Sequence, residues 1–478
     1  MQDNRKSLKF RIKLSFMKFS SKINAFINDY VDALLSNRAA VFAGAGLSMA
    51  CGYCDWKGLM NPIAEELGLN IDEVSDLTEL AQWYVDDCGV KNHLNQKIVS
   101  AFMKNVSLSE NHRILASLPI RTYWTTNFDH LIEKALYEAG KTVDKKVTNI
   151  DFTCSPSCYD AKVYKMNGDV EQIDTVVLTK SDFEEYSEKR RLFNDAFKAD
   201  FMSHLFLFIG VSFNDPNMWN ILTKIRNNVG KYMRRAYYFA KKEDLYKSLW
   251  INSLKKYGLT PIIIEDYSDI PEILDEVKRR YLQHTIFISG AIGHYEAPWT
   301  KERVSEFVTA LSRRLAKDYN VMTGFGLGVG SDVINGALQT FENEKIKNWG
   351  NRLIMRPFPQ FDEKTPDAVR QSRWNEYRRA FLSGTGASIF LFGNKKVADQ
   401  VVISNGMLQE YEIACEKKQI IIPVGVTGYV AKDIWEKESS KWDILIKSKY
   451  EVLNKSYVND ELINAVVDIL EYELNRCK

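Results

Sequence analysis

The stretch VFAGAGLSMACGYCDWKGL, residues 41–59, begins as an apolar strand and runs into Gly44, Ala45 and Gly46, with Ser48 close behind. A strand that ends in glycines lets the backbone approach a phosphate, and exposed amides at such a turn can bind one. Glycines at strand ends are often ordinary turns, so this stretch alone is weak evidence. Its meaning depends on what surrounds it.

The composition predicts a soluble globular protein of two or three domains, since the chain has 478 residues, 45% hydrophobic and 26% charged. The net charge of +2 gives no reason to expect nucleic acid as a partner. Residues 1–25 are strongly basic without an apolar stripe, and we interpret them as a basic extension rather than a membrane-surface helix. Without a spanning stretch or a secretion signal, we expect a cytoplasmic protein with no membrane partner.

The cysteines are scattered and odd in number, which argues against a disulfide framework. Cys51/Cys54 and Cys154/Cys158 have spacings that zinc sites use, but no histidine flanks them. We therefore predict no metal and interpret these thiols as small buried side chains.

Short apolar runs alternate with helical patterns along the chain, which is typical of parallel sheets covered by helices. A helical pattern over 271–284 ends one series and a new series begins at residue 285, so we predict α/β domains over 26–283 and 284–478. We interpret residues 140–161 as a surface excursion. The predicted strands are 38–43, 120–125, 162–166, 205–210, 236–240, 261–264, 285–290, 353–358, 388–393 and 420–425, and the predicted helices include 126–139, 216–229, 300–317, 374–383, 405–417 and one from Ser331.

Further motifs follow the glycine turn in a fixed order. Gly52–Lys57, GYCDWK, matches the Gly-x-x-Asp-Phe-Arg stretch that follows Gly-Ala-Gly-x-Ser in sirtuins. Residues 125–129, TTNFD, are similar to the sirtuin Thr-Gln-Asn-x-Asp motif, and residues 210–213, GVSF, to the late Gly-Thr-Ser loop. Residues 214–217, NDPN, extend that loop as in bacterial sirtuin-like defence proteins. The first domain therefore resembles a sirtuin.

A sirtuin-like site implies NAD+ lying across the strand ends of a doubly wound, Rossmann-like sheet. The resemblance places Asn127 at the nicotinamide ribose and its attacking water. Asparagine before a helical stretch is also a favoured N-cap, but the neighbouring Thr126 and Asp129 favour the functional reading. The other implied NAD+ contacts are Gly44, Ala45, Gly46 and Ser48 at the phosphates, Asp55 and Trp56 near nicotinamide and ribose, and Gly210 and Ser212 on the adenosine side.

Residues 163–170, VYKMNGDV, depart from the sirtuin pattern, in which this strand ends in His-Gly and the imidazole takes a ribose proton. Asn167 stands in that place, and a carboxamide cannot accept and release a proton near neutral pH. Locally, Asn167-Gly168 also reads as a hairpin turn. If the site is sirtuin-like, Asn167 is a substitution that stops turnover, a variant using Asn127 and water alone, or part of a site that only binds. We favour the first reading because the neighbouring motifs are intact.

The reaction that the resemblance implies is cleavage of the nicotinamide–ribose bond through an oxocarbenium-like state. Sirtuins that bind acyl-lysine usually carry a small zinc module with two cysteine pairs after the His-Gly. Between Gly168 and Cys415 this chain has no cysteine, which favours hydrolysis over protein deacylation.

A second glycine run, VMTGFGLGVGSDVING at 321–336, precedes a helix and fits a dinucleotide or phosphate cradle. Its glycines, with Ser289-Gly290 and the Arg356–Pro359 stretch at other strand ends, resemble the nucleotide-sensing SLOG domain. An arginine or glutamate on a helix is usually solvated or ion-paired, but together these side chains make a plausible ligand set. The signal-binding residues that the resemblance implies are Ser289, Gly290, Gly324, Gly326, Gly328, Gly330, Arg378, Lys395 and Glu410.

A sirtuin-like domain followed by SLOG resembles the effectors of Thoeris anti-phage systems. That family implies a cyclic ADP-ribose isomer made by a TIR-domain partner protein, release of NAD+ hydrolysis when SLOG binds it, and abortive infection. It also implies tetramers, and filaments on activation. Two alternatives stay open, a deacylase or ADP-ribosyltransferase and a nucleotide-binding regulator without turnover.

Overall fold

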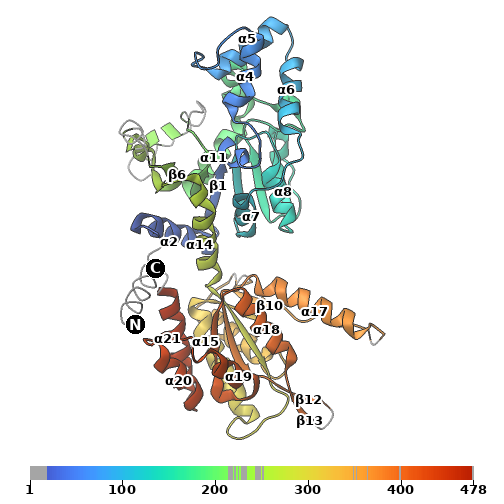
Figure 1. Ribbon diagram of the computed structural model, residues 1–478, viewed down its shortest axis with the longest axis vertical. Coiled ribbons are helices and arrows are strands. Elements are labelled where there is room, and N and C mark those ends of the chain that lie inside the picture. The colour runs from blue at the N-terminus through green and yellow to red at the C-terminus, as the bar shows by residue number, and fades with distance from the viewer. Residues whose placement is uncertain are drawn as a thin grey trace, which may run out of the picture. The chain divides into compact units, whose positions relative to one another are not determined.

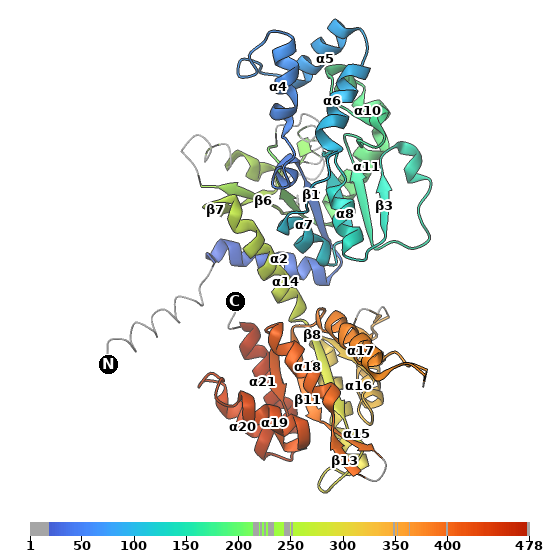
Figure 2. The same ribbon diagram turned by 45° about the vertical axis from the view of Figure 1, so that its right-hand side comes forward.

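The computed structural model describes residues 19–475 except 214–218, 220–221, 224–225, 228–233, 243–248, 250–251, 348, 351, 363 and 398–399. These residues form two compact units, Phe19–Lys278 and the part from Arg279 onward, each with its own sheet (Figures 1 and 2). Residues 1–18 of the predicted basic extension and much of the predicted helix 216–229 lie outside the described residues, as do residues 214–217. The boundary predicted near residue 283 falls at the end of helix α14 (Ile270–Leu282).

The first unit contains a seven-stranded parallel sheet in the order β3-β4-β2-β1-β5-β6-β7. Strands β2, β3 and β4 lie on one side of β1, with β4 inserted between β2 and the edge strand β3, and β5, β6 and β7 lie on the other side, so the direction of winding reverses between β1 and β5. In doubly wound sheets ligands bind outside the carboxyl ends of the strands at such a switch point. The strands are β1 (Ala39–Ala43), β2 (Thr122–Thr125), β3 (Val143–Lys146), β4 (Ala161–Lys165), β5 (Leu205–Ile209), β6 (Ala236–Lys241) and β7 (Leu259–Ile264).

Both faces of this sheet are covered, which explains why its strands read as continuous apolar runs. Helix α11 (Arg191–Ser203) buries Phe193, Phe197 and Phe201, one helical turn apart, in the same cluster as Phe42 and Trp124. Side chains of α7 (Glu110–Ser117) and α8 (Leu131–Glu138) gather with Val41 and Tyr123, which point to the opposite face. The remaining helices are α2 (Ser21–Leu35), α3 (Ala45–Met49), α4 (Trp56–Glu66), α5 (Leu77–Cys88), α6 (Asn92–Phe102), α9 (Lys180–Glu184) and α10 (Tyr186–Lys189).

The segment 140–161 was expected to be a surface excursion, and that prediction is wrong at its start. Residues 143–146, VDKK, form β3, which pairs in parallel with β4. The charged residues hid this strand because Asp144 and Lys146 are buried as an ion pair of 2.9 Å instead of facing solvent. Only edge strands and paired charges make such a sequence compatible with a sheet.

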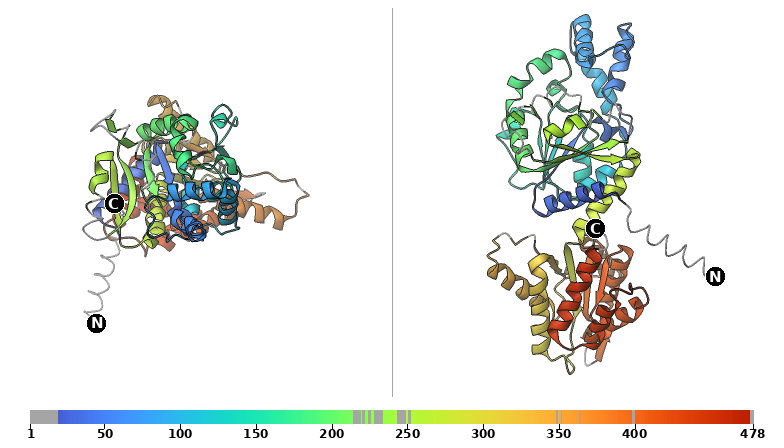
Figure 3. Two further views of the ribbon diagram at one scale, coloured as in Figure 1. Left: turned by 90° about the horizontal axis from the view of Figure 1, so that it is seen from above. Right: turned by 90° about the vertical axis from the view of Figure 1, so that its left-hand side faces the viewer.

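The second unit contains a five-stranded parallel sheet in the order β10-β9-β8-β11-β14. Its core on one face joins β8 and β11 to α15, α16, α20 and α21, and the other face is covered by α17, α18 and α19. Helix α17 and the hairpin β12–β13 project from the edges of this unit (Figures 1 and 3). The strands are β8 (Thr285–Ala291), β9 (Asn320–Thr323), β10 (Leu353–Met355), β11 (Ala387–Phe392), β12 (Asn394–Val397), β13 (Gln400–Ile403) and β14 (Ile420–Pro423), and the helices are α15 (Lys301–Asp318), α16 (Gly330–Asn343), α17 (Asp367–Leu382), α18 (Asn405–Glu416), α19 (Tyr429–Glu438), α20 (Lys447–Lys455) and α21 (Asn459–Asn475).

Together the units confirm the predicted fold class, two α/β domains with doubly wound parallel sheets. Among the described helices, none combines the length and apolar character that a membrane crossing requires.

Candidate functional site

One row of paired residues crosses four neighbouring strands of the first sheet and fixes where the predicted site lies. Ala43 of β1 pairs with Thr125 of β2 and Ile209 of β5, and Thr125 pairs with Lys165 of β4. The predicted site residues follow within two residues of each strand: Gly44 and Gly210 come directly after β1 and β5, and Asn127 and Asn167 are the second residues after β2 and β4. The structure therefore brings these residues to one edge of the sheet, beside the switch between β1 and β5.

The glycine turn is shaped by contact between two segments of backbone. A Cβ on Gly44 would stand 2.5 Å from the carbonyl oxygen of Gly210, and a Cβ on Gly46 would stand 2.8 Å from the Cα of Gly210. The Gly44 amide donates to the Ile209 carbonyl (2.9 Å) and the Gly46 amide to the Gly210 carbonyl (2.9 Å). The sequence suggested exposed amides for a phosphate, but these two amides are engaged. The glycines are required because the loops after β1 and β5 touch.

Asn127 is not a helix cap, because α8 begins at Leu131 with His130 as its N-cap. Its side-chain amide Nδ2 instead donates to the Gly44 carbonyl (3.0 Å) and to Ser48 Oγ (3.0 Å). Ser48 Oγ in turn donates to Asp129 Oδ2 at 2.7 Å. A carboxylate only accepts hydrogen bonds, so Ser48 must donate to Asp129 and accept from Asn127. Both amide hydrogens of Asn127 are therefore used within the protein. The Oδ1 atom of Asn127 is left as the acceptor for whatever the site binds.

Asn167 lies in a turn beyond β4 and is almost entirely buried. The hairpin that Asn167-Gly168 allowed does not form, because both sheet partners of β4 are the parallel strands β2 and β3. Gly168 is required by its φ of +94° and by Thr175, whose carbonyl oxygen would stand 2.3 Å from an added Cβ. The Asn167 carbonyl accepts from the Val177 amide at 2.9 Å, which fixes the turn.

The remaining predicted contacts of NAD+ have observed partners of their own. Asp55 caps α4 by accepting from the Gly58 amide at 2.8 Å. Trp56 stacks on Phe183 with ring centroids 6.0 Å apart. Thr126 donates its backbone amide to Ala43, and Ser212 is exposed. The structure joins Asn127, Ser48, Asp129 and Gly44 by hydrogen bonds, and gives no such bond from that group to Asp55, Trp56 or Ser212.

The cysteines do not form a metal centre in the part of the chain that is described, where no group of three or more His, Cys, Asp or Glu side chains has a metal-binding arrangement. Cys154 and Cys158 are exposed, so the prediction that they are buried is wrong. Cys51 is half-buried, and its Sγ lies 3.7 Å from Nδ1 of His112, a histidine distant in sequence.

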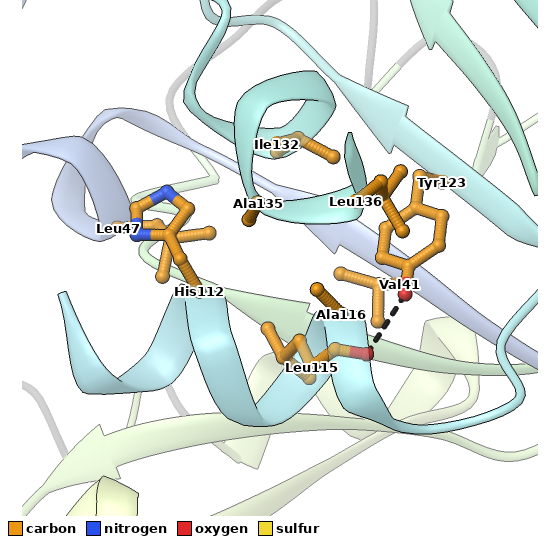
Figure 4. Close-up of a pocket in the computed structure, with 9 residues that line it drawn as sticks. All are labelled: Val41, Leu47, His112, Leu115, Ala116, Tyr123, Ile132, Ala135 and Leu136. Carbon is orange, nitrogen blue, oxygen red and sulfur yellow. Dashed lines mark hydrogen bonds between the residues drawn. The ribbon is translucent and has the colours of Figure 1, made fainter. Parts of the chain in front are cut away.

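His112 borders a small apolar cavity between β1, β2, α7 and α8, with Leu47, Val41 and Tyr123 among its lining residues (Figure 4). Its Nδ1 lies 2.8 Å from Ser109 Oγ, and Nε2 is buried with no hydrogen-bond partner among the described residues. Burial lowers the pKa of His112 to about 4. The ring is therefore neutral at pH 7 and belongs to the core.

We expect His112 to make the first unit sensitive to acid. The unfolded chain binds a proton near the ordinary pKa of 6.5, whereas the folded chain resists it until about pH 4. The contribution of His112 to the free energy of unfolding is thus fully present above pH 6.5, and the free energy of unfolding falls by about 3 kcal/mol as the pH drops towards 4. Denaturant unfolding of His112→Gln should show a shallower loss between pH 7 and pH 4.5 than the parent chain. Parallel pH profiles of the two proteins would contradict this account.

The second sheet brings Ser289, Arg378 and Glu410 together, all of them buried. Ser289 Oγ donates to Glu410 Oε2 at 2.6 Å, and Arg378 Nε lies 3.6 Å from Glu410 Oε1. Arg378 also donates to Gln409 Oε1 (2.8 Å) and stands over the Phe358 ring (4.6 Å). Burial raises the pKa of Glu410 and lowers the pKa of Arg378. The attraction between the two charges therefore does not fully offset the free energy lost when both are removed from water. Lys395 is exposed on β12 and contributes charge near Glu410.

The second glycine run packs against β8 as the first packs against β5. A Cβ on Gly326 would stand 1.8 Å from the Gly290 carbonyl oxygen, and a Cβ on Gly330 would stand 2.6 Å from Phe325 Cα. Gly328 has a φ of +70°, and Gly324 contacts the Phe358 ring that Arg378 covers. The glycine run after β9 therefore adjoins the end of β8, where Ser289 meets Glu410 of α18 and Arg378 of α17, with Lys395 near Glu410.

Sequence reasoning missed several buried polar residues of the first unit, among them Lys165, Glu133 and His112. Lys165 had a signal in the sequence, because a lysine inside a strand buried on both faces needs paired charges. Glu133 and His112 had none, since each sits on a helix where polar residues usually face solvent.

Comparison with known proteins gives matches to both units. A family model described as a SIR2-like domain matches residues 121–262, and one described as the Sir2- and TIR-associating SLOG family matches residues 269–473. A curated protein of Bacillus cereus (strain MSX-D12), NAD(+) hydrolase ThsA, is 39% identical over 95% of this chain and 99% of its own length. Proteins of the same name from Cytobacillus dafuensis and Enterococcus faecium are 37% and 35% identical, covering 96% and 93% of this chain and 98% and 97% of their own.

Proposed function

The chain belongs to the ThsA family of NAD(+) hydrolases, and on this basis we propose that it binds NAD+ and belongs to a Thoeris-type anti-phage defence system in bacteria. The reaction for which a site of this family is built is cleavage of NAD+ to nicotinamide and ADP-ribose. The observation that carries this proposal is the pair of bonds from Asn127 Nδ2 to Gly44 and Ser48. These bonds join the glycine turn after β1 to the Asn127 loop after β2, at the switch point of a doubly wound sheet.

In this proposal NAD+ lies over the loops after β1, β2, β4 and β5. The close approach of Gly44 and Gly46 to Gly210 leaves room for the dinucleotide backbone. Because Ser48 and Asp129 orient the amide of Asn127 and Nδ2 is engaged, Oδ1 is the atom that would accept from the attacking water or a ribose hydroxyl. Fixed dipoles of this kind stabilise the positive charge that develops on the ribose as nicotinamide leaves.

Asn167 limits the rate of this chemistry. It occupies the position from which a histidine would accept the ribose proton, and its carboxamide cannot act as a base. Any turnover in this chain then depends on Asn127 and water. The chain is accordingly slow or inactive in hydrolysis while retaining the capacity to bind NAD+.

The second unit is the sensor. Its buried Arg378 and Glu410 beside the glycine run supply a cation for a phosphate and an acceptor for a ribose hydroxyl, which suits a cyclic ADP-ribose isomer. The isomer comes from a TIR-domain partner protein, and the assembly that responds is a tetramer that forms filaments. The signal drives hydrolysis if it binds the active arrangement better than the resting one.

Two alternatives make different predictions. A deacylase or ADP-ribosyltransferase would use the same NAD+ site with a peptide as acceptor, and an assay for modified peptide distinguishes it. A nucleotide-binding regulator would bind NAD+ and never consume it, which the asparagine at position 167 favours.

Loss of Asn127 tests the proposed site without requiring turnover. Asn127→Ala removes the acceptor that faces the substrate and the bonds to Gly44 and Ser48, so we expect NAD+ affinity to fall roughly tenfold or more. Isothermal titration with NAD+ measures this, and Asn149→Ala is the matched control, because Asn149 is an amide on the same unit that bonds the Lys189 carbonyl at the surface. Equal NAD+ affinity in Asn127→Ala and the control would refute the assignment.

A further inference from the structure

A buried group of charges lies directly beneath the two loops that carry Asn127 and Asn167. Lys165, the last residue of β4, is completely buried, and its Nζ lies 3.5 Å from Glu133 Oε1 and 3.6 Å from Asp169 Oδ2. Glu133 and Asp169 are buried as well. Burying a lysine in a sheet is costly unless its charge is paired and its hydrogen bonds are made, so the contacts of Lys165 indicate what it does there.

The contacts of Lys165 are directed at the backbone of the Asn127 loop. Its Nζ donates to the Phe128 carbonyl at 3.2 Å and to the Asp129 carbonyl. The same Phe128 carbonyl accepts from the Val170 amide at 3.0 Å. Lys165 thus ties the turn after β2 to the turn after β4, from a position two residues before Asn167.

Further charges hold the second turn to the edge strand. Lys145 of β3 donates to Asp169 Oδ2 at 3.1 Å and to Glu171 Oε2 at 2.9 Å. Asp169 Oδ1 also accepts from the Glu171 amide at 2.8 Å. Glu133 accepts no hydrogen bond from the described residues, and burial raises its pKa. Lys165 is the cation that offsets the negative charge of Glu133.

We propose that Lys165 is a positioning residue, which sets the separation of the Asn127 and Asn167 loops and thereby aligns them on the nicotinamide ribose of NAD+. This inference rests on the proposed NAD+ site and adds a residue that touches no substrate. The phosphate end of the site is formed by Gly44, Gly46 and Gly210, whereas the bonds and ion pairs of Lys165 go to Phe128, Asp129, Glu133 and Asp169, so the phosphate end should be independent of Lys165.

The chain contains a matched control for this role. Lys146 of β3 is also almost completely buried and pairs with Asp144 at 2.9 Å. Its Nζ donates to the Cys154 carbonyl at 2.7 Å and to Ser155 Oγ at 2.9 Å, in a loop that carries no site residue. Losing Lys165 leaves the buried Glu133 without its cation, and losing Lys146 leaves the buried Asp144 with only Lys162 at 4.0 Å, so both losses lower the melting temperature.

The experiment compares Lys165→Met with Lys146→Met in the full chain, measuring binding of NAD+ and of ADP by calorimetry. We expect Lys165→Met to weaken NAD+ binding by roughly 10- to 100-fold, the effect of losing hydrogen bonds to a charged group, with ADP binding little changed. Lys146→Met should keep both affinities. A parallel fall of NAD+ and ADP affinity, or equal effects of the two lysines, would mean that Lys165 is only structural and would overturn the proposal. Failure of the unchanged protein to bind NAD+ would instead refute the proposed function.

A double variant guards against misfolding. Lys165→Met combined with Glu133→Gln removes both charges of this buried pair while Asp169 keeps Lys145 as its partner, and such neutral replacements recover stability that a single loss removes. We expect the melting temperature to recover while NAD+ affinity stays low, because the ties to Phe128 and Asp129 are still missing. Recovery of NAD+ affinity along with the melting temperature would overturn the positioning role.

Discussion

Asn167→His is expected to raise signal-dependent release of nicotinamide from NAD+ by about 10²- to 10⁴-fold, the usual contribution of a positioned general base. The physical reason is that imidazole titrates near neutral pH and carboxamide does not. Position 167 lies two residues beyond Lys165, whose partner in the sheet is Thr125, so an imidazole there stands beside the Asn127 loop. The assay is chromatographic separation of nicotinamide and ADP-ribose, with each cyclic ADP-ribose isomer supplied in turn.

Two controls make that result specific. Asn127→Ala in the Asn167→His protein should return turnover to the level of the starting chain, because the water and ribose then lose their acceptor. Thermal denaturation shows whether the larger ring is accommodated at a nearly buried position. If Asn167→His folds, binds NAD+ and still releases no nicotinamide with any isomer, the regulator reading is correct and hydrolysis is not the function.

Arg378→Ala is expected to abolish binding of the cyclic ADP-ribose signal and, in the Asn167→His protein, to abolish activation. Arg378 is the buried cation of the second site, and its loss leaves Glu410 with only the exposed Lys395 as a nearby cation. Removing one member of a buried pair costs about 3–5 kcal/mol, so the second unit should also melt at a lower temperature. NAD+ affinity of the first unit should not change. Calorimetric titration with the signal and with NAD+ measures both effects.

Arg379→Ala is the matched control for this change. Arg379 is the next residue on α17, but it is half-exposed and pairs with Glu416 on the surface. Exposed pairs contribute little, so signal binding and stability should stay near those of the parent. Arg378→Gln tests the charge at similar side-chain length. Signal-dependent nicotinamide release that persists in Arg378→Ala would show that the signal acts elsewhere.

The architecture was largely predictable, because parallel strands buried on both faces leave continuous apolar runs in the sequence. Strands β1, β5 and β11 lie within a residue of their predicted ranges for this reason. The end of β1 could be foreseen from its glycines, although the residue that makes them necessary, Gly210, lies far away in the sequence. The same holds for Gly326, because a Cβ there would collide with the carbonyl oxygen of Gly290 in β8.

Features that depend on partners far apart in the sequence were not predictable. Strand β3 reads as a polar loop until Asp144 and Lys146 are seen to neutralise each other. The helix predicted from residue 126 starts at Leu131, because Asn127 and Asp129 bond to Gly44 and Ser48 instead of extending α8. No local pattern records that Nδ2 of Asn127 is committed to the glycine turn, and this determines which of its atoms faces a ligand.

The most direct test of the central claim is calorimetric titration of the unchanged chain, Asn167 included, with NAD+. We predict saturable binding at one site per chain, weakened strongly in Gly46→Val, whose side chain would collide with Gly210. Absence of NAD+ binding by the folded chain, or binding that survives both Gly46→Val and Asn127→Ala, would contradict the account.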